Sequence, residues 1–187
     1  MPPENTKAQI RATAVAMFAA NGYDKTSLRE IAERVGITKA SLYYHYPSKQ
    51  ALLAALVEPL IRDWRETVDG AVALPHTPAN VRLALERCLD AMLRHRAVAG
   101  LVLRDPAAIL ATLAALVEDL LEVNARLHRW LAGSNPSPAG RIRAAAATEV
   151  LGLALGSGAI LPEVSDADLR VTLLDAAQAV LAAAPRP

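Results

Sequence analysis

The sequence contains few of the features that stabilise small secreted proteins or cross membranes. It has a single cysteine, Cys88, so no disulfide can form within the chain. No stretch reaches roughly 18 uncharged apolar residues with membrane-type flanks, so we expect no transmembrane span and no membrane partner. Charged residues precede any long apolar run, which argues against a secretory signal peptide. Together these absences predict a cytoplasmic protein.

Aromatic residues are scarce and the alternation typical of strands is absent. Aromatics make up 4% of the chain and apolar residues 53%, so the core must be aliphatic and the chain is not disordered. Alanine and leucine recur at helical spacing, which predicts an all-α protein. Pro59 lies inside the fourth helix and is expected to bend or split it. The nine expected helices cover approximately residues 4–20, 28–35, 38–45, 48–70, 78–96, 97–103, 106–131, 139–156 and 166–184.

Local signals define the short helices near the N-terminus. Residues 27–30, Ser-Leu-Arg-Glu, form a capping box in which the serine and the glutamate each satisfy free backbone amides. Gly36 ends that helix, because glycine adopts the left-handed conformation at low cost. Thr38 is expected to cap the next helix, Pro47 to stop it, and Ser48 to cap the long helix that follows.

The net charge of +1 hides an asymmetry along the chain. All four lysines lie within the first 49 residues, where seven basic residues face four acidic ones. The remainder has 13 arginines against 15 acidic residues. A basic N-terminal segment joined to a slightly acidic body is typical of a polyanion-binding module.

Two short helices joined by a tight turn at residues 35–38 predict a helix-turn-helix, in which the second helix enters the major groove of DNA. Ile37 and Leu42 are the apolar positions that would hold this second helix to the rest of the domain. Three residues at its exposed N-terminal end are predicted to meet base edges: Lys39, Ala40 and Ser41. Lysine can donate to guanine, serine can bond either way, and the alanine methyl can touch thymine.

Contacts to the DNA backbone are predicted around the same helix. Its C-terminal half carries polar-tipped aromatic rings that can pack on sugars and bond to phosphates. The first turns of the neighbouring helices offer free amides for a phosphate. The predicted backbone contacts are Thr26, Ser27, Tyr43, Tyr44, His45 and Lys49.

Residues 26–49, TSLREIAERVGITKASLYYHYPSK, resemble the N-terminal DNA-binding domain of the tetracycline-repressor (TetR) family. The resemblance extends from about Ile10 to Leu53. Tyr46 stands where phenylalanine is common in the family, and its ring can still supply an apolar surface to the core. The resemblance implies a three-helix helix-turn-helix domain at 1–48 and a helical-bundle domain for ligand binding and dimerisation at 49–187.

The resemblance also implies a function. Such proteins are bacterial transcriptional regulators that bind palindromic operators on double-stranded DNA as homodimers, built through the last two helices. A small molecule in the C-terminal domain changes the separation of the two DNA-binding heads, through the helix that begins near Lys49. The chain is therefore expected to be a repressor released from its operator by a small-molecule effector of unknown identity.

The body offers candidates for ligand contact. Asn124 interrupts an apolar helical stripe, either as an interhelical hydrogen-bonding group or as a group that orients a ligand. Cys88, Met92 and His95 share another stripe, which lies either in the core or along a pocket that suits the polarizable thioether. The small residues of 139–156, with the final helix, are expected to form a two-fold interface. The predicted ligand-binding residues are Trp64, Cys88, Met92, His95, Asn124 and Glu149.

Two other functions compete with DNA binding. One is an enzyme, for example a hydrolase that pairs Cys88 with His95, but the chain has no nucleophile-elbow glycine pattern, carboxylate pair or phosphate loop. We therefore expect no enzyme activity, catalytic residue, cofactor or metal site. The other is a helical scaffold that does not bind DNA.

Overall fold

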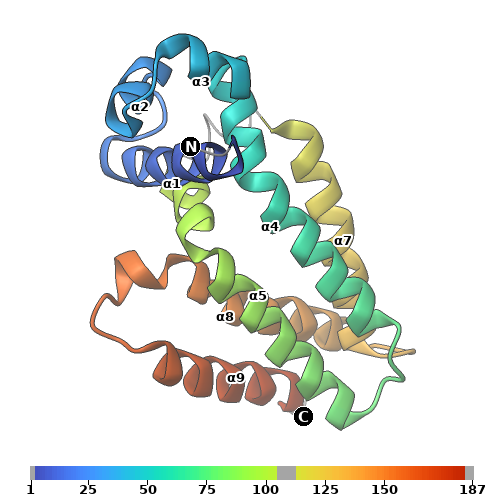
Figure 1. The fold of residues 1–187 in the computed structure, drawn as a ribbon. Coiled ribbons are helices and arrows are strands. Elements are labelled where there is room, and N and C mark those ends of the chain that lie inside the picture. Colours follow the sequence, from blue (N-terminus) through green and yellow to red (C-terminus); the bar gives the residue numbers. More distant parts are fainter. Residues whose placement is uncertain (1–2, 105–112, 184–187) are drawn as a thin grey trace.

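The computed structural model of the chain describes residues 3–104 and 113–183, which fold into eight α-helices without a strand (Figure 1). The predicted all-α fold is confirmed. An N-terminal head of three helices lies above a bundle formed by the later ones (Figure 1). The helices are α1 (Pro3–Asn21), α2 (Leu28–Val35), α3 (Lys39–His45), α4 (Lys49–Val72), α5 (Pro78–Arg104), α7 (Ala114–Ala132), α8 (Pro138–Ile160) and α9 (Asp166–Ala182).

Two predicted interruptions are absent. Helix α5 runs without a break through Ala97, so the separate helix expected over 97–103 is wrong. No proline or glycine lies between Arg96 and Ala99, and nothing local therefore ends the helix there. Pro59 lies within α4 without splitting it, because α4 buries apolar residues on both sides of the proline. The expected helix start at residue 106 lies outside the described residues.

The predicted caps of the N-terminal helices are confirmed. The Ser27 backbone N–H donates to Glu30 Oε2 at 2.7 Å, and the Glu30 N–H donates to Ser27 Oγ at 3.2 Å. The Ser27 hydroxyl also donates to this carboxylate. The hydrogen bonds that the carboxylate accepts from the hydroxyl and from the backbone N–H of Ser27 lower the pKa of Glu30. Thr38 accepts from the Ser41 N–H at 3.1 Å and Ser48 from the Ala51 N–H at 2.9 Å. Four residues thus fix where three helices begin.

The head has its own aliphatic core, and that core extends beyond the first three helices. Ile10, Phe18, Ile31 and Leu42 are fully or almost fully buried in it. Tyr46 is buried there too, as expected for the aromatic ring at that position. Further members come from the first three turns of α4 and from the end of α5: Leu52, Leu53, Leu56, Val57, Ile61 and Leu101. The helix-turn-helix is therefore packed directly onto α4.

A second core fills the body. Helix α5 packs against α4, α8 and α9, and α8 lies beside α9 (Figure 1). Trp64, Leu85, Leu127, Leu151 and Leu173 are buried among these helices. No helix in the described part of the chain is long and apolar enough to cross a membrane.

The left-handed backbone of Gly36, in the turn between α2 and α3, can be tested by substitution. Gly36 has φ 78° and ψ 31°, and a Cβ placed there would meet nothing within 4 Å. Gly36→Ala should therefore lower the free energy of unfolding by about 1 kcal/mol, through the left-handed backbone alone. Urea denaturation followed by circular dichroism measures the change.

Gly100→Ala is the matched control, because Gly100 lies inside α5 and also has open space around it. It should raise the free energy of unfolding by about 0.5–1 kcal/mol, since alanine is the better helix former. Equal changes of the same sign in both variants would contradict the backbone explanation.

Candidate nucleic-acid interface

Helices α2 and α3 form a helix-turn-helix around Gly36. The N–H groups of Gly36 and Ile37 both donate to the carbonyl of Ala32 at 3.0 Å, which closes the end of α2. Helix α2 buries Leu28, Ile31 and Ala32, whereas the buried residue of α3 is Leu42. Helix α3 is thus held from one side and presents the rest of its surface to solvent, as a groove-binding helix requires.

The exposed face of α3 carries the residues predicted to read DNA. Lys39 and Ala40 are exposed and Ser41 is half-buried in its first turn. The Tyr44 side chain is 86% exposed and that of Tyr43 is 41% exposed. Lys39 Nζ lies 5.5 Å from the centre of the Tyr43 ring, and the rings of Tyr44 and His45 meet edge to face. Two tyrosines on the surface are a large aromatic area for a groove or a phosphate backbone to cover.

Thr26 and Ser27 are engaged within the chain. Thr26 is 1% exposed, its hydroxyl donates to the Gly22 carbonyl at 2.9 Å, and its N–H donates to the Tyr23 carbonyl at 3.2 Å. Both of its donors therefore stabilise the turn before α2 and are not free for a phosphate. Ser27 is exposed, with its hydroxyl in the capping box.

Lys49 fastens the start of α4 to the turn between α1 and α2. Its ammonium donates to the carbonyl of Tyr23 at 2.9 Å and to that of Asp24 at 3.3 Å. The same nitrogen lies 4.4 Å from the centre of the Tyr23 ring, within cation–π range. The predicted phosphate contact at Lys49 would have to share or replace these bonds.

A cavity of about 170 Å³ lies in the body between α4, α5, α7 and α8. It brings together most of the residues predicted to bind a ligand: Trp64, Met92, His95, Asn124 and Glu149. Sequence reasoning missed His128 and Thr148, which also line the cavity. His128 follows Asn124 by one helical turn, and this i, i+4 spacing could have placed it on the same face.

Cys88 does not line the cavity. It is fully buried in the adjacent core, and burial raises the pKa of its thiol to about 12. The thiol is therefore protonated near neutral pH and poorly nucleophilic. The ring of His95 is bound to Asp63, so the structure gives no support to a hydrolytic Cys88–His95 pair.

The structure shows one of the two roles that the sequence left open for Asn124, a hydrogen bond between helices. Trp64 Nε1 donates to Asn124 Oδ1 at 2.8 Å, which confirms the hydrogen bond between α4 and α7. The amide also lines the cavity, so it occupies the position that ligand contact would need. On α7 and α8, His128 Nε2 lies 2.6 Å from Thr148 Oγ1.

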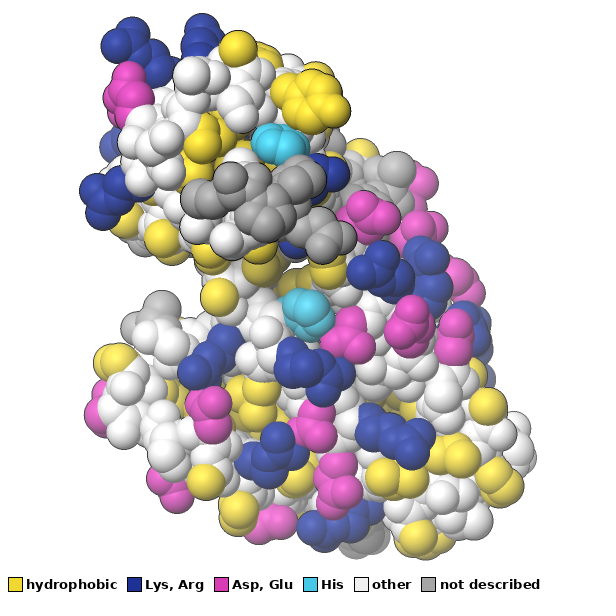
Figure 2. Space-filling model, in the orientation of Figure 1, with side chains coloured by type: hydrophobic (Ala, Val, Ile, Leu, Met, Phe, Trp, Pro, Cys, Tyr) yellow, Lys and Arg dark blue, Asp and Glu magenta, His cyan; other side chains and the backbone are white. Residues whose placement is uncertain are grey.

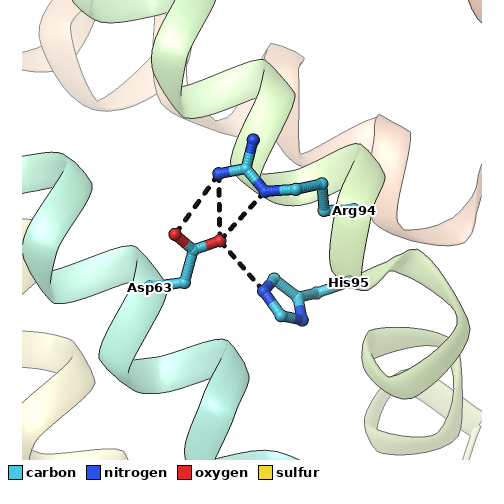
Figure 3. A network of polar contacts seen from close by, with 3 residues as sticks. All are labelled: Asp63, Arg94 and His95. Carbon is cyan, nitrogen blue, oxygen red and sulfur yellow. Dashed lines mark hydrogen bonds and ion pairs between the residues drawn. The ribbon is translucent and has the colours of Figure 1, made fainter.

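A polar network at the edge of the cavity joins α4 to α5 (Figure 3). The Asp63 carboxylate accepts from Arg94 Nη2 at 3.0 Å and from His95 Nε2 at 2.9 Å (Figure 3). The His95 ring is also part of the cavity wall. Among the described residues, no three His, Cys, Asp or Glu side chains are grouped as a metal site would require.

Comparison with known proteins finds regulators that resemble the N-terminal part of the chain. Residues 10–56 match the family model of bacterial regulatory proteins of the tetR family. The HTH-type transcriptional regulator EthR of Mycolicibacterium smegmatis is 30% identical over 87 residues, 46% of this chain. The negative transcriptional regulator of the biofilm operon icaADBC, IcaR of Staphylococcus epidermidis, is 44% identical over 52 residues, 28% of this chain. The chain covers 39% of the length of EthR and 28% of that of IcaR.

Solved structures extend the likeness to the whole fold. A TerR/AcrR-family transcriptional regulator from Aquifex aeolicus matches with a TM-score of 0.73 at 21% identity, over 91% of this chain and 96% of its own. AmtR of Mycobacterium smegmatis matches with a TM-score of 0.73 at 20% identity, over 95% of this chain and 86% of its own. Residues 10–56 are thus similar to the bacterial regulatory proteins of the tetR family, and over the rest of the chain the likeness is one of fold.

Proposed function

We propose that the protein is a sequence-specific DNA-binding regulator that represses transcription and is released from its operator by a small molecule. The observation that carries the proposal is the exposed face of α3, with Lys39 at its start and two tyrosines on its surface. Of the relatives, EthR is a transcriptional regulator and IcaR a negative one, which supports repression as the outcome.

The exposed residues of α3 divide between bases and backbone. Lys39 can donate to guanine O6 and N7, while Ala40 and Ser41 touch neighbouring base edges. Tyr43, Tyr44 and His45 pack on sugars and bond to phosphates. Basic side chains line the outer edge of the head, whereas basic and acidic ones alternate over the body (Figure 2). This distribution orients the head toward a polyanion.

A homodimer would form through α8 and α9. Large apolar side chains are exposed on both helices: Ile142, Leu153 and Ile160 on α8, and Val171 on α9. A self-complementary contact around a two-fold axis would cover them, and it would present two heads to a palindrome.

Release would act through α4. Leu56 and Val57 belong to the core of the head, and about one and two turns further along α4 Leu60 and Trp64 form part of the cavity wall. A ligand that prefers a different separation of α4 from α7 and α8 would shift α4, and α4 would carry the head with it.

Substitutions on α3 separate base reading from backbone contact. Lys39→Ala should cost about 1–3 kcal/mol at one base position and change the preferred base there. Tyr44→Ala should weaken binding to all sequences by about 1.5–3 kcal/mol, since a hydrogen bond to a charged phosphate is lost. Fluorescence anisotropy on a duplex that the wild-type chain binds specifically, and on its single-base variants, measures both effects.

Arg87→Ala is the control, because it removes an exposed positive charge from the body, on α5 beside Gly70 of α4. It should leave the affinity unchanged. Wild-type affinity should also fall steeply with salt, because phosphate contacts release counterions. Unchanged binding by both α3 variants would exclude this helix as the reading element.

The interface is tested by charge on its apolar residues. The double variant Leu153→Glu, Val171→Glu should convert a wild-type dimer to a monomer, since buried unpaired carboxylates oppose association. Sedimentation equilibrium measures the mass. Leu121→Glu is the control, because Leu121 is an exposed leucine on α7, outside the proposed interface, and this variant should remain dimeric. A dimeric double variant, or a monomeric wild-type chain, would contradict the proposed interface.

A further inference from the structure

The walls of the cavity are mainly apolar. Leu60 and the Trp64 indole come from α4, Met92 from α5 and Leu155 from α8. Its volume of about 170 Å³ is close to that of engineered cavities that hold benzene. The size suits a molecule of roughly one aromatic ring with a short side chain, smaller than most drug-sized ligands.

Among the acidic, lysine and arginine side chains of the described residues, the cavity lining has only a negative one. Glu149 is its one carboxylate, and no lysine or arginine among the described residues lines the cavity. Within residues 3–104 and 113–183, which the structure describes, no basic side chain forms an ion pair with Glu149. Arg94, at the edge, is bound to Asp63 (Figure 3). An anionic ligand would therefore meet a carboxylate without a free cation to pair with.

The two histidines of the lining have their Nε2 atoms engaged. His95 Nε2 lies 2.9 Å from a carboxylate oxygen of Asp63, so this nitrogen carries a proton. His128 Nε2 donates to Thr148 Oγ1, because the threonine hydroxyl itself donates to the Ala145 carbonyl at 2.7 Å. Nδ1 of the neutral His128 ring is therefore an acceptor.

The surroundings of His128 favour its neutral form. Burial lowers the pKa of His128, and the nearby carboxylate of Glu149 offsets part of that shift. A neutral His128 leaves the charge of Glu149 uncompensated at the cavity. The lining thus combines an unpaired negative charge, the Nδ1 acceptor of His128 and an aromatic indole, a set that favours a cation with N–H donors.

We propose that the cavity binds a small apolar amine in its protonated form, with the ammonium group against Glu149 and the hydrocarbon among the side chains of α4, α5 and α8. The inference rests on the proposed function in taking this cavity as the effector site. A neutral alcohol of the same shape would leave the carboxylate unpaired, and a carboxylate ligand would be repelled by it.

Isothermal titration calorimetry of the full chain at neutral pH tests the ligand class with three probes of similar size: 2-phenylethylamine, 2-phenylethanol and phenylacetate. The amine should bind roughly two- to fivefold more tightly than the alcohol, because Glu149 is exposed at the mouth of its cavity and exposed ion pairs are weak. Phenylacetate should bind more weakly than the alcohol. An alcohol that matches the amine, a tighter carboxylate, or no binding by any probe would overturn the proposal.

Glu149→Gln keeps the shape of the side chain and removes its charge, so the preference for the amine over the alcohol should disappear. Glu163→Gln removes one exposed negative charge from the turn between α8 and α9, outside the cavity, and should keep the preference. Retention of the preference in Glu149→Gln would contradict the assigned role of this carboxylate.

Binding to DNA is measured separately, by anisotropy with and without the amine. An amine that binds with the expected preference but leaves DNA affinity unchanged would contradict ligand-controlled release while supporting the ligand class. Loss of DNA affinity without any preference for the amine would support release and overturn the ligand class. The failure of either proposal is thus distinguishable from that of the other.

Discussion

Helix α4 belongs to both hydrophobic cores, and the rest of the structure depends on this shared membership. Leu52 and Leu53 are buried with the head, whereas Trp64 and Val68 are buried with the body. Because a helix is stiff along its axis, a displacement of α4 in one core also displaces the part of α4 that lies in the other core. The ammonium of Lys49 adds a direct fastening between the first turn of α4 and the turn that precedes α2. In the proposed mechanism, a shift of α4 at the cavity would therefore move the head with it.

The head itself separates residues that build it from residues that are free to meet DNA. Thr26 directs its donors inward, and Leu42 anchors α3 to the core. Lys39, Tyr43 and Tyr44 have no comparable place within the core and remain on the surface. Burial of the first group holds the second in a fixed arrangement, which reduces the entropy lost when a groove is occupied. The same separation holds at the cavity, where buried Cys88 supports the wall that Met92 lines.

The features that the sequence predicted correctly in the head are helix caps and a turn, which depend on interactions between neighbouring residues. The capping box, the caps at Thr38 and Ser48 and the turn at Gly36 each involve atoms within about four residues, so their pattern is readable directly. The residues predicted at the cavity because helical stripes place them on inward faces are Trp64, Met92, His95 and Asn124. Glu149 also lines the cavity but is exposed, and the sequence left solvent, the interface and the pocket all open for it. The bonds of Lys49 to the carbonyls of Tyr23 and Asp24 join residues 26 and 25 positions apart, so they depend on tertiary packing and could not be read in this way. The false break at Ala97 came from weighting composition over the absence of a helix breaker.

The central claim is that α3 reads a palindrome on behalf of a two-fold dimer. Selection of bound duplexes from random double-stranded DNA by the wild-type chain tests it most directly, because the outcome reports sequence preference and symmetry together. The account predicts an enriched site with two inverted half-sites, separated by the spacing of two heads along one face of the double helix. Recovery of no enriched sequence, or of a single half-site without inverted symmetry, would contradict it.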